Sequence, residues 1–305
     1  MGLLLVTATG ICSMMGASIN VIPFMIQKNV PGIGPYVVPA FLFAAIPAIF
    51  AAYAYAILSS AMPRAGGSYL YASRGLSPYL GFIASFSQWF GLSIVIGVIS
   101  YIIVPFIRDV FFNLGFINIS DFLEVGSVRL TISLLLIWLF VLINIVGGKV
   151  YKNTLIPMLV IMFVLGSIVL ITGLVYDQND FINSVLNSEN RVIEPTSDIK
   201  FDWKIFLTAA TLMFSSFIGF DAIAQTGNEA KNPTKNIPRA ILLAIFIVAS
   251  YYILFTISVY NIVPWSFVAD ESITKDITAP GLLSYVLPPF WGILIIIGAA
   301  IALIN

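Results

Sequence analysis

The sequence predicts an all-α integral membrane protein. Only 9% of its 305 residues are Asp, Glu, Lys or Arg, whereas 60% are hydrophobic, and soluble domains carry about 25% charged residues. The charged residues are also unevenly spaced, so that long intervals of the chain carry none. Most of these intervals are long enough for a helix that crosses a bilayer, which takes about 20 apolar residues.

Uncharged intervals locate the spans, because a charged side chain is costly at mid-bilayer and a helix satisfies its own backbone polar groups there. We expect one transmembrane domain over residues 1–305. Its eight predicted spans are residues 3–26, 36–60, 79–107, 129–148, 154–176, 205–225, 240–262 and 290–305. The sequence stops inside the eighth span with no polar flank after it, which favours a chain truncated shortly after the start of that helix.

The distribution of basic residues predicts the orientation, because short cytoplasmic loops are rich in Lys and Arg. The loops 61–77, 149–153 and 226–239 carry closely spaced Lys and Arg. The opposite loops spread theirs over about twice the length and hold most of the acids. We therefore predict a multi-pass protein of the cell membrane with a cytoplasmic N-terminus.

Several function classes find no support in the composition. A net charge of zero gives no electrostatic case for nucleic acid. The chain has no His and one Cys, so the commonest metal ligand and general base are missing. Asp221 is the only acid within a predicted span, and no nucleophile–base pair or metal set can be assembled. We predict no catalytic residue, no metal and no cofactor, and hence no enzyme.

Two of the predicted spans carry residues that weaken a helix. The first contains Gly10, the polar and small stretch from Gly16 to Asn20, and Pro23. The sixth contains Gly219 and ends on Asp221. Small residues in a membrane helix can instead serve close helix packing, and Asp221 can instead be an interfacial residue near the cytoplasmic end.

The positions of these two spans favour a functional interpretation. Interrupted helices at matching places, first and sixth, are typical of a five-plus-five inverted repeat whose broken helices meet at a mid-membrane binding site. The N–H groups at a half-helix N-terminus suit a carboxylate, and freed carbonyls suit an ammonium group or a cation. A site that offers both N–H groups and free carbonyls would suit an amino acid, which carries a carboxylate and an ammonium group.

Three segments resemble the amino acid–polyamine–organocation permeases. Gly16-Ala17-Ser18-Ile19 stands where that family has an unwound Gly-x-Gly-Ile stretch. Residues 62–72, MPRAGGSYLYA, match the loop after the second span. The third segment comprises residues 217–221, FIGFD, followed by 229–233, EAKNP, and 237–241, IPRAI. The resemblance extends along essentially the whole chain.

This resemblance implies a leucine-transporter-like bundle with discontinuous helices 1 and 6 and an incomplete second repeat. It implies a substrate site between these helices. The carboxylate would lie on the backbone of Gly16, Ala17, Ser18 and Ile19. The amino group would lie on the carbonyls of Ser215, Ser216 and Ile218, with Gly219 allowing the unwinding. Phe214 and Phe217 are the candidates for an aromatic cover.

The chain departs from the family pattern at three informative positions. Ser18 replaces the second glycine and Asn20 follows the isoleucine, so the substrate is expected to be more polar than a simple aliphatic amino acid. Asn20 can instead satisfy neighbouring backbone. Some relatives place a Lys in the fifth span, where Val160 stands here, so that a lysine-based proton coupling has no candidate.

The predicted function is secondary transport of amino acids or related small amines by alternating access. Its partners would be the small-molecule substrate, the lipid bilayer and a coupling ion, H⁺ or Na⁺. A non-transporting solute sensor on the same fold is the alternative, because both functions need the same binding site. A fragment that ends in the eighth span is expected to be poorly active alone.

Overall fold

The computed structural model describes residues 1–16, 18–146, 149–193 and 199–304, and within these residues it contains helices and no strand. The helices before the long 190–202 connection are α1 (Leu3–Met14), α2 (Ser18–Asn29), η1 (Gly34–Tyr36), α3 (Val37–Ala61), α4 (Gly67–Gly75), α5 (Pro78–Asn113), α6 (Ile117–Glu124), α7 (Gly126–Val146), α8 (Lys149–Val175) and α9 (Gln178–Glu189). Those after it are α10 (Trp203–Phe214), η2 (Ser215–Phe217), α11 (Asp221–Gln225), α12 (Pro233–Ile262), α13 (Trp265–Thr274), α14 (Ala279–Leu283) and α15 (Pro289–Ile304).

Six helical segments are long and apolar enough to cross a membrane, namely Leu3–Asn29, Gly34–Ala61, Pro78–Phe112, Leu155–Val175, Trp203–Gln225 and Pro233–Ile262. A seventh is obtained if α6 and the Gly126–Leu139 part of α7, which meet at an angle of 83°, count as one span. A helix thus stands at each of the eight predicted positions, but the described residues form six full spans, or seven with the bent pair, rather than eight. The 16 residues of α15 rise only about 24 Å, less than the roughly 30 Å of a bilayer core.

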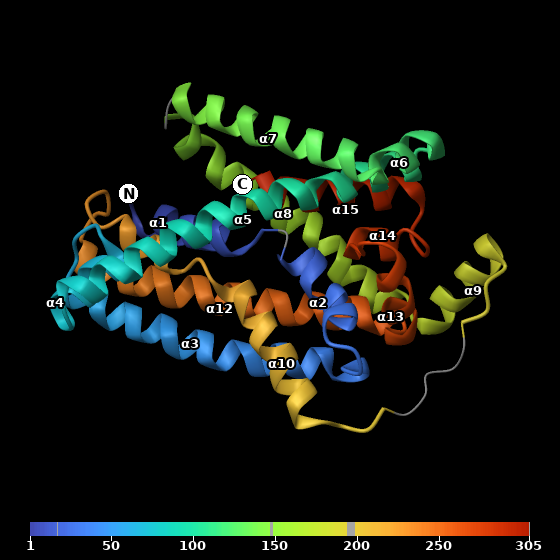
Figure 1. The fold of residues 1–305 in the computed structure, drawn as a ribbon, viewed down its shortest axis with the longest axis horizontal. Helices are drawn as coiled ribbons and strands as arrows, with labels where there is room; N and C mark the ends of the chain where they lie inside the picture. The colour runs from blue at the N-terminus through green and yellow to red at the C-terminus, as the bar shows by residue number, and fades with distance from the viewer. Residues whose placement is uncertain (17, 147–148, 194–198, 305) are drawn as a thin grey trace.

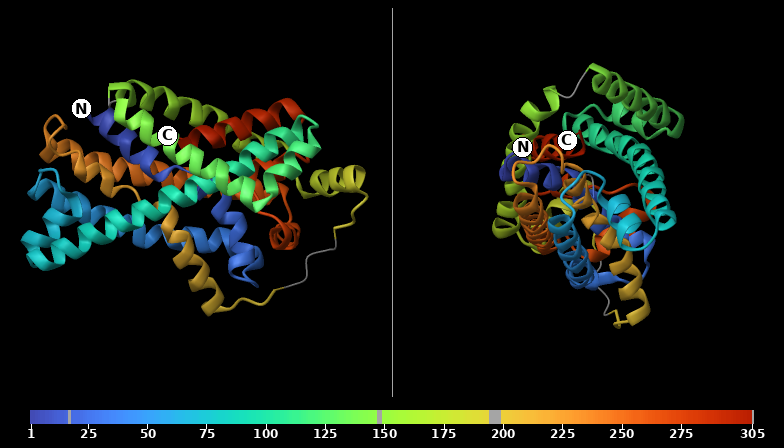
Figure 2. Two further views of the ribbon diagram at one scale, coloured as in Figure 1. Left: turned by 45° about the horizontal axis from the view of Figure 1, so that its top comes forward. Right: turned by 90° about the vertical axis from the view of Figure 1, so that its left-hand side faces the viewer.

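Helix α12 lies at the centre of the bundle, where it packs against α1, α3 and α8 (Figure 1). Helix α15 lies between α8 and α5, and α7 lies at the periphery, where it packs against α5 (Figures 1 and 2). The core between α3, η2 and α12 contains three fully buried aromatic rings, Phe41, Phe217 and Tyr252, whose centroids lie 5.3 to 5.8 Å apart. These rings fix the position of the sixth span beside the second and the seventh.

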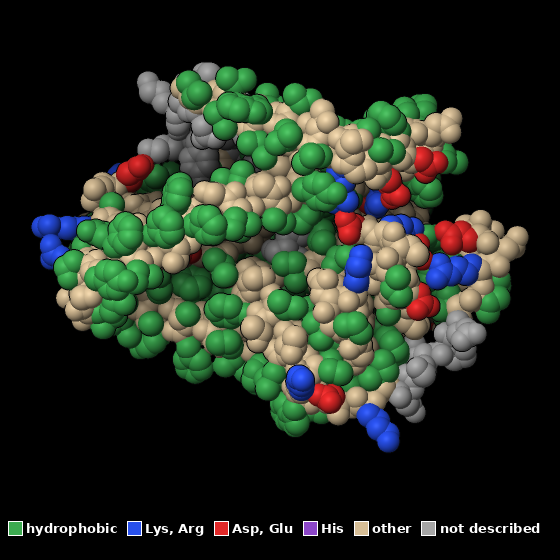
Figure 3. All heavy atoms as spheres, viewed as in Figure 1, with side chains coloured by type: hydrophobic (Ala, Val, Ile, Leu, Met, Phe, Trp, Pro, Cys, Tyr) green, Lys and Arg blue, Asp and Glu red, His purple; other side chains and the backbone are tan. Residues whose placement is uncertain are grey.

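The surface agrees with a position in lipid. Hydrophobic side chains cover the middle of the face in Figure 3, and charged side chains gather over α6, α9 and α13, near α4 and where α10 begins. Many large apolar side chains of α5 and α7 are exposed, for example Trp89 and Leu135. Apolar side chains exposed over such an area are stable in hydrocarbon rather than in water.

The N-terminus, α4 and the 226–232 loop lie at one end of the bundle (Figure 1). The Lys231 amide donates to the Met1 carbonyl at 2.7 Å, and the Ala65 amide donates to the Asn228 side-chain oxygen at 3.4 Å. A Cβ on Gly227 would lie 2.6 Å from the carbonyl carbon of Arg64. The loops 61–77 and 226–239, which the sequence assigns to the same side of the membrane, are therefore in contact.

The packing of α8 on α12 depends on a close backbone approach. A Cβ on Gly173 would lie 2.6 Å from Cα of Ser258, and Asn261 donates a hydrogen bond to the Gly173 carbonyl at 3.0 Å. Gly173→Ala should therefore lower the stability of the detergent-solubilised protein, by about 1–3 kcal/mol as for other overpacked sites. A thermal melt would measure this loss.

Gly91→Ala on α5 is the matched control, because a Cβ there would meet nothing within 4 Å. Equal melting temperatures for the two variants would show that the contact between α8 and α12 is looser than described.

Candidate functional site

The first span is interrupted after α1. The helix ends at Met14, Met15 leaves helical geometry with a ψ of 79°, and α2 begins at Ser18. The amide of Gly16 donates to the Met14 carbonyl at 3.0 Å. Ala17 lies outside the described residues, and the structure describes only the backbone of Ser18. The predicted interruption of this span is therefore observed at Met15 and Gly16.

A buried tyrosine satisfies the end of α1. The hydroxyl of Tyr252 donates to the Met14 carbonyl at 2.6 Å, and Tyr252 is fully buried. Since the last carbonyls of a helix have no partner within that helix, this bond supplies one from α12. It also ties the interruption of the first span to the seventh span.

The sixth span is interrupted between α10 and α11. The helix ends at Phe214, η2 adds one 3₁₀ turn, and Ile218 is extended with φ −71° and ψ 136°. Gly219 then has φ +135°, a conformation open to glycine at little cost and to other residues only with strain. The new helix α11 begins at Asp221. The predicted break at Ile218 and Gly219 is therefore observed.

The two interruptions lie against each other. A Cβ on Gly219 would lie 2.6 Å from the carbonyl oxygen of Ser13, in the last turn of α1. Helix α1 neighbours α11, and α2 neighbours both α10 and η2. Glycine is thus required at position 219 both for its positive φ and for the close approach of the two broken spans.

Parts of both interruptions are open. A Cβ on Gly16 would meet nothing within 4 Å. Ser13 and Ser215 are exposed, and Ile218 is 55% exposed although it lies in the interior of a predicted span. The hydroxyl of Ser216 is buried and has no hydrogen-bond partner among the described residues. Since buried polar groups are nearly always paired, an unpaired hydroxyl at the break is a candidate contact for a ligand.

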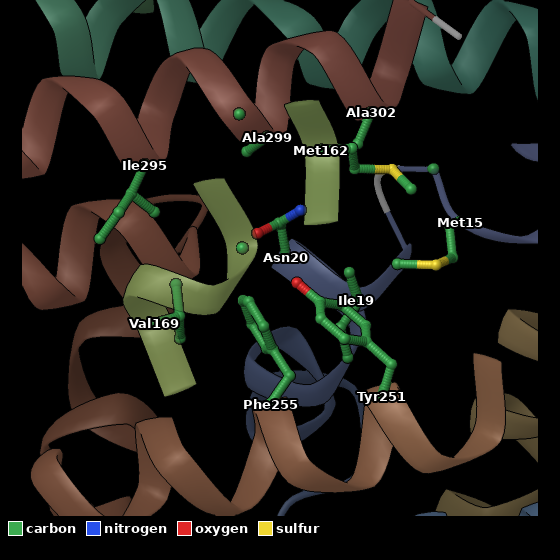
Figure 4. Close-up of a pocket in the computed structure, with 13 residues that line it drawn as sticks. Met15, Ile19, Asn20, Met162, Val169, Tyr251, Phe255, Ile295, Ala299 and Ala302 are labelled. Carbon is green, nitrogen blue, oxygen red and sulfur yellow. The ribbon is translucent and has the colours of Figure 1, made fainter. Parts of the chain in front are cut away.

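A small cavity of about 20 Å³ lies beside the first interruption, between α2, α8, α12 and α15 (Figure 4). Asn20 projects into it from α2, and Tyr251 and Phe255 reach it from α12. Its lining residues are Met15, Gly16, Ile19, Asn20, Met162, Gly166, Val169, Tyr251, Phe255, Ile295, Gly298, Ala299 and Ala302. This volume suits about one water molecule, so an amino acid fits only if the surrounding helices move apart.

A larger cavity, which we call the vestibule, lies between α2, α5, the end of α10 and the 276–278 segment, and has a volume of about 350 Å³. It is lined by Val21, Ile22, Met25, Ile26, Asn29, Tyr101, Ile102, Pro105, Arg129, Leu212, Ser215, Asp276, Ile277 and Thr278. Small-molecule pockets range over about 300–1,000 Å³. The vestibule is therefore large enough for a small solute, and it reaches the sixth span at Ser215.

Four of the predicted site residues line one of the two cavities, whereas Ser216, Ile218 and Gly219 line neither. Gly16, Ile19 and Asn20 line the small cavity, and Ser215 lines the vestibule. Phe214 is half-buried, whereas Phe217 is fully buried against Phe41 and Tyr252. Phe217 therefore lies in the core, Phe214 packs against the same core, and neither of the two predicted aromatic covers lines a cavity.

In the fifth span, the structure shows which residues of α8 lie near the first interruption. Val160 is 54% exposed, and the residues of α8 that line the small cavity are Met162, Gly166 and Val169. Tyr251 and Tyr252 did not figure among the predicted site residues. The available signal was a pair of adjacent tyrosines in the interior of an apolar span, since a buried tyrosine hydroxyl usually finds a hydrogen-bond partner.

The helices and their interruptions define a class of protein, a multi-pass α-helical membrane protein with two spans broken at one place. Within this class, the chain belongs to the amino acid permease family, whose sequence pattern matches residues 1–304. Membership of this transporter family confirms the resemblance seen in the sequence and the prediction of a transporter rather than an enzyme.

Individual relatives match shorter stretches. Cationic amino acid transporter 9, chloroplastic, of Arabidopsis thaliana is 32% identical over 102 residues, or 33% of this chain and 17% of the relative. Cationic amino acid transporter 4 of Homo sapiens is 38% identical over 63 residues, 21% of this chain and 10% of the relative. Branched-chain amino acid permease BcaP of Bacillus subtilis (strain 168) is 32% identical over 59 residues, 19% of this chain and 13% of the relative. The matched stretches thus span less than a fifth of these relatives' lengths.

Removing the Tyr252 hydroxyl tests the anchoring of α1. Tyr252→Phe keeps the aromatic packing but deprives the buried Met14 carbonyl of its 2.6 Å bond, which should cost about 1–3 kcal/mol of stability. Thermal melting of the purified protein would measure the loss. Tyr53→Phe, at an exposed tyrosine of α3, should melt like the wild type, and a comparable loss there would argue against a specific role for Tyr252.

Proposed function

We propose that the chain forms the substrate-binding part of a secondary transporter that moves an amino acid or a related small amine across the cell membrane by alternating access. The observation that carries this proposal is the direct contact of two broken spans, with Gly219 against Ser13. Interrupted membrane helices that meet in mid-membrane are the usual substrate site of transporters built on inverted repeats. The fold we propose is leucine-transporter-like, with helices 1 and 6 discontinuous.

The proposed substrate contacts follow the polarity of the broken helices. The backbone from Gly16 to Ile19, at the start of α2, would bind the carboxylate through its N–H groups other than that of Gly16, which donates to the Met14 carbonyl, since a helix N-terminus attracts anions. The carbonyls of Ser215, Ser216 and Ile218 would accept the ammonium group. The unpaired hydroxyl of Ser216 and the carboxamide of Asn20 in the small cavity offer further hydrogen bonds.

The difference between the two cavities supports an alternating mechanism. The vestibule reaches Ser215 with about 350 Å³, whereas the cavity beside Gly16 offers about 20 Å³. We propose that the first, second, sixth and seventh spans rock against the third, fourth, fifth and eighth, which would widen the small cavity when a substrate enters. A coupling ion, H⁺ or Na⁺, and a cytoplasmic N-terminus belong to the same proposal.

Gly16→Leu tests this proposal directly. A Cβ at Gly16 would meet nothing within 4 Å, so a side chain can leave the backbone there, and a leucine would fill the small cavity that Gly16 lines; a thermal melt checks that the variant still folds. Uptake of radiolabelled amino acid into proteoliposomes should fall at least about tenfold, the effect of losing about 1.4 kcal/mol of binding.

Gly91→Leu, an equally open glycine on α5, is the control and should leave uptake unchanged. Undiminished uptake by Gly16→Leu would contradict the proposed site. A wild-type protein that binds amino acids but never moves them would instead favour the solute sensor.

A further inference from the structure

An ion pair closes one wall of the vestibule. Arg129, at the start of α7, lies 2.8 Å from the carboxylate of Asp276, and both residues line the vestibule. The guanidinium also lies 3.7 Å from the ring centre of Tyr101 and donates to the Tyr101 carbonyl at 3.2 Å. Arg129 is thus held by three contacts, and its side chain is only 14% exposed.

The segment that carries Asp276 is fixed on both sides. Thr278 donates to Asp109 at 2.6 Å, and Arg108 donates to the Asp276 carbonyl at 3.3 Å. The Ile277 amide donates to the sulfur of Met25 in α2 at 3.3 Å. The carboxylate of Asp276 is therefore positioned by its backbone as well as by Arg129.

Two of the neighbouring basic side chains, Arg108 and Lys275, are engaged elsewhere, and a third, Lys28, lines the adjoining cavity with Arg129 and Asp276. Arg108 pairs with Asp109 at 2.7 Å and with Glu124 at 2.8 Å. Lys275 pairs with Glu271 at 2.6 Å. Partial burial would raise the pKa of Glu271, but the hydrogen bonds and charges of Lys275 and Arg191 outweigh it and lower that pKa. Glu271 is thus ionised at neutral pH and holds Lys275, so Arg129 is the cation that neutralises Asp276 at the vestibule.

The rest of the lining of the vestibule and of the small cavity carries no charge, whereas an adjoining cavity of about 210 Å³, which shares Arg129 and Asp276 with the vestibule, is also lined by Lys28, Arg108, Glu124 and Lys275. Arg129 and Asp276 are the charged residues that line the vestibule, and the residues that line the small cavity include none, within the described chain. Most of the vestibule wall is aliphatic, with Val21, Ile22, Ile26, Ile102 and Leu212. Burying an unpaired charge in such surroundings costs several kcal/mol.

We propose that this site selects amino acids with uncharged side chains, and that the Arg129–Asp276 pair sets this selectivity by engaging the vestibule carboxylate that could otherwise receive a cationic side chain. The selectivity rests on the proposed transport function and adds the substrate class to it. The names of the relatives leave the class open, since they include both cationic and branched-chain amino acid transporters. The paired charges that line the vestibule favour branched-chain over cationic amino acids.

The test measures uptake of radiolabelled leucine by the full chain in proteoliposomes, with unlabelled lysine or isoleucine as competitor. Isoleucine should compete with the wild type at least about tenfold better than lysine, a difference of about 1.4 kcal/mol. Arg129→Met leaves Asp276 unpaired, so competition by lysine should improve about tenfold. The double variant Arg129→Met with Asp276→Asn should lose this gain.

Arg191→Met is the matched control, because it breaks another ion pair, with Glu271 at 2.6 Å, whose residues do not line the vestibule. It should leave the selectivity unchanged. If Arg129→Met does not insert, Arg129→Gln replaces it. The comparison of isoleucine with lysine as competitors of the wild type tests the substrate class without any variant.

Three results would overturn the inference. One is a wild type that takes lysine as readily as isoleucine. Another is an Arg129 variant that retains leucine uptake and gains nothing for lysine. The last is a wild type that neither binds nor moves any of these amino acids, which would contradict the proposed transport function itself and the selectivity with it.

Discussion

The contact between Gly219 and the Ser13 carbonyl is the constraint on which the rest of the site depends. It brings two membrane-crossing segments together at the point where each leaves helical geometry. Backbone polar groups freed inside a bilayer are costly unless they find partners. Here Tyr252 supplies a partner for the Met14 carbonyl. Gly16 lines the small cavity and Ser215 lines the vestibule, where a polar solute could reach the interruptions.

The surrounding helices give this contact its rigidity. The buried rings of Phe41, Phe217 and Tyr252 tie the second, sixth and seventh spans together. The close approach of α8 to α12 at Gly173 fixes the fifth span against the seventh. At one end of the vestibule, ion pairs join α5, α6, α7 and the 275–278 segment. Apolar packing therefore holds the interior, and paired charges hold the rim.

Much of this architecture could be predicted from the sequence, because the absence of charge over long intervals directly reflects the cost of charge in lipid. Gly219 and the Gly16–Asn20 stretch likewise indicated where helices break. The orientation of side chains was harder to predict. Phe217 lies in the core and Val160 faces outward, since hydrophobicity in a membrane protein does not distinguish a lipid-facing position from a buried one. The Arg129–Asp276 pair joins residues far apart in the chain, and no local pattern predicts it.

The central claim, that the two interruptions form one amino acid site, is tested most directly by chemical protection of Ser215, which is exposed and lines the vestibule. In a Cys12→Ser background, a water-soluble thiol reagent should label Ser215→Cys, and leucine should slow that labelling severalfold. Ser188→Cys, an exposed position on α9 outside the membrane-spanning segments, should be labelled at a rate that leucine does not change. Labelling of Ser215→Cys that leucine leaves unchanged would contradict the account.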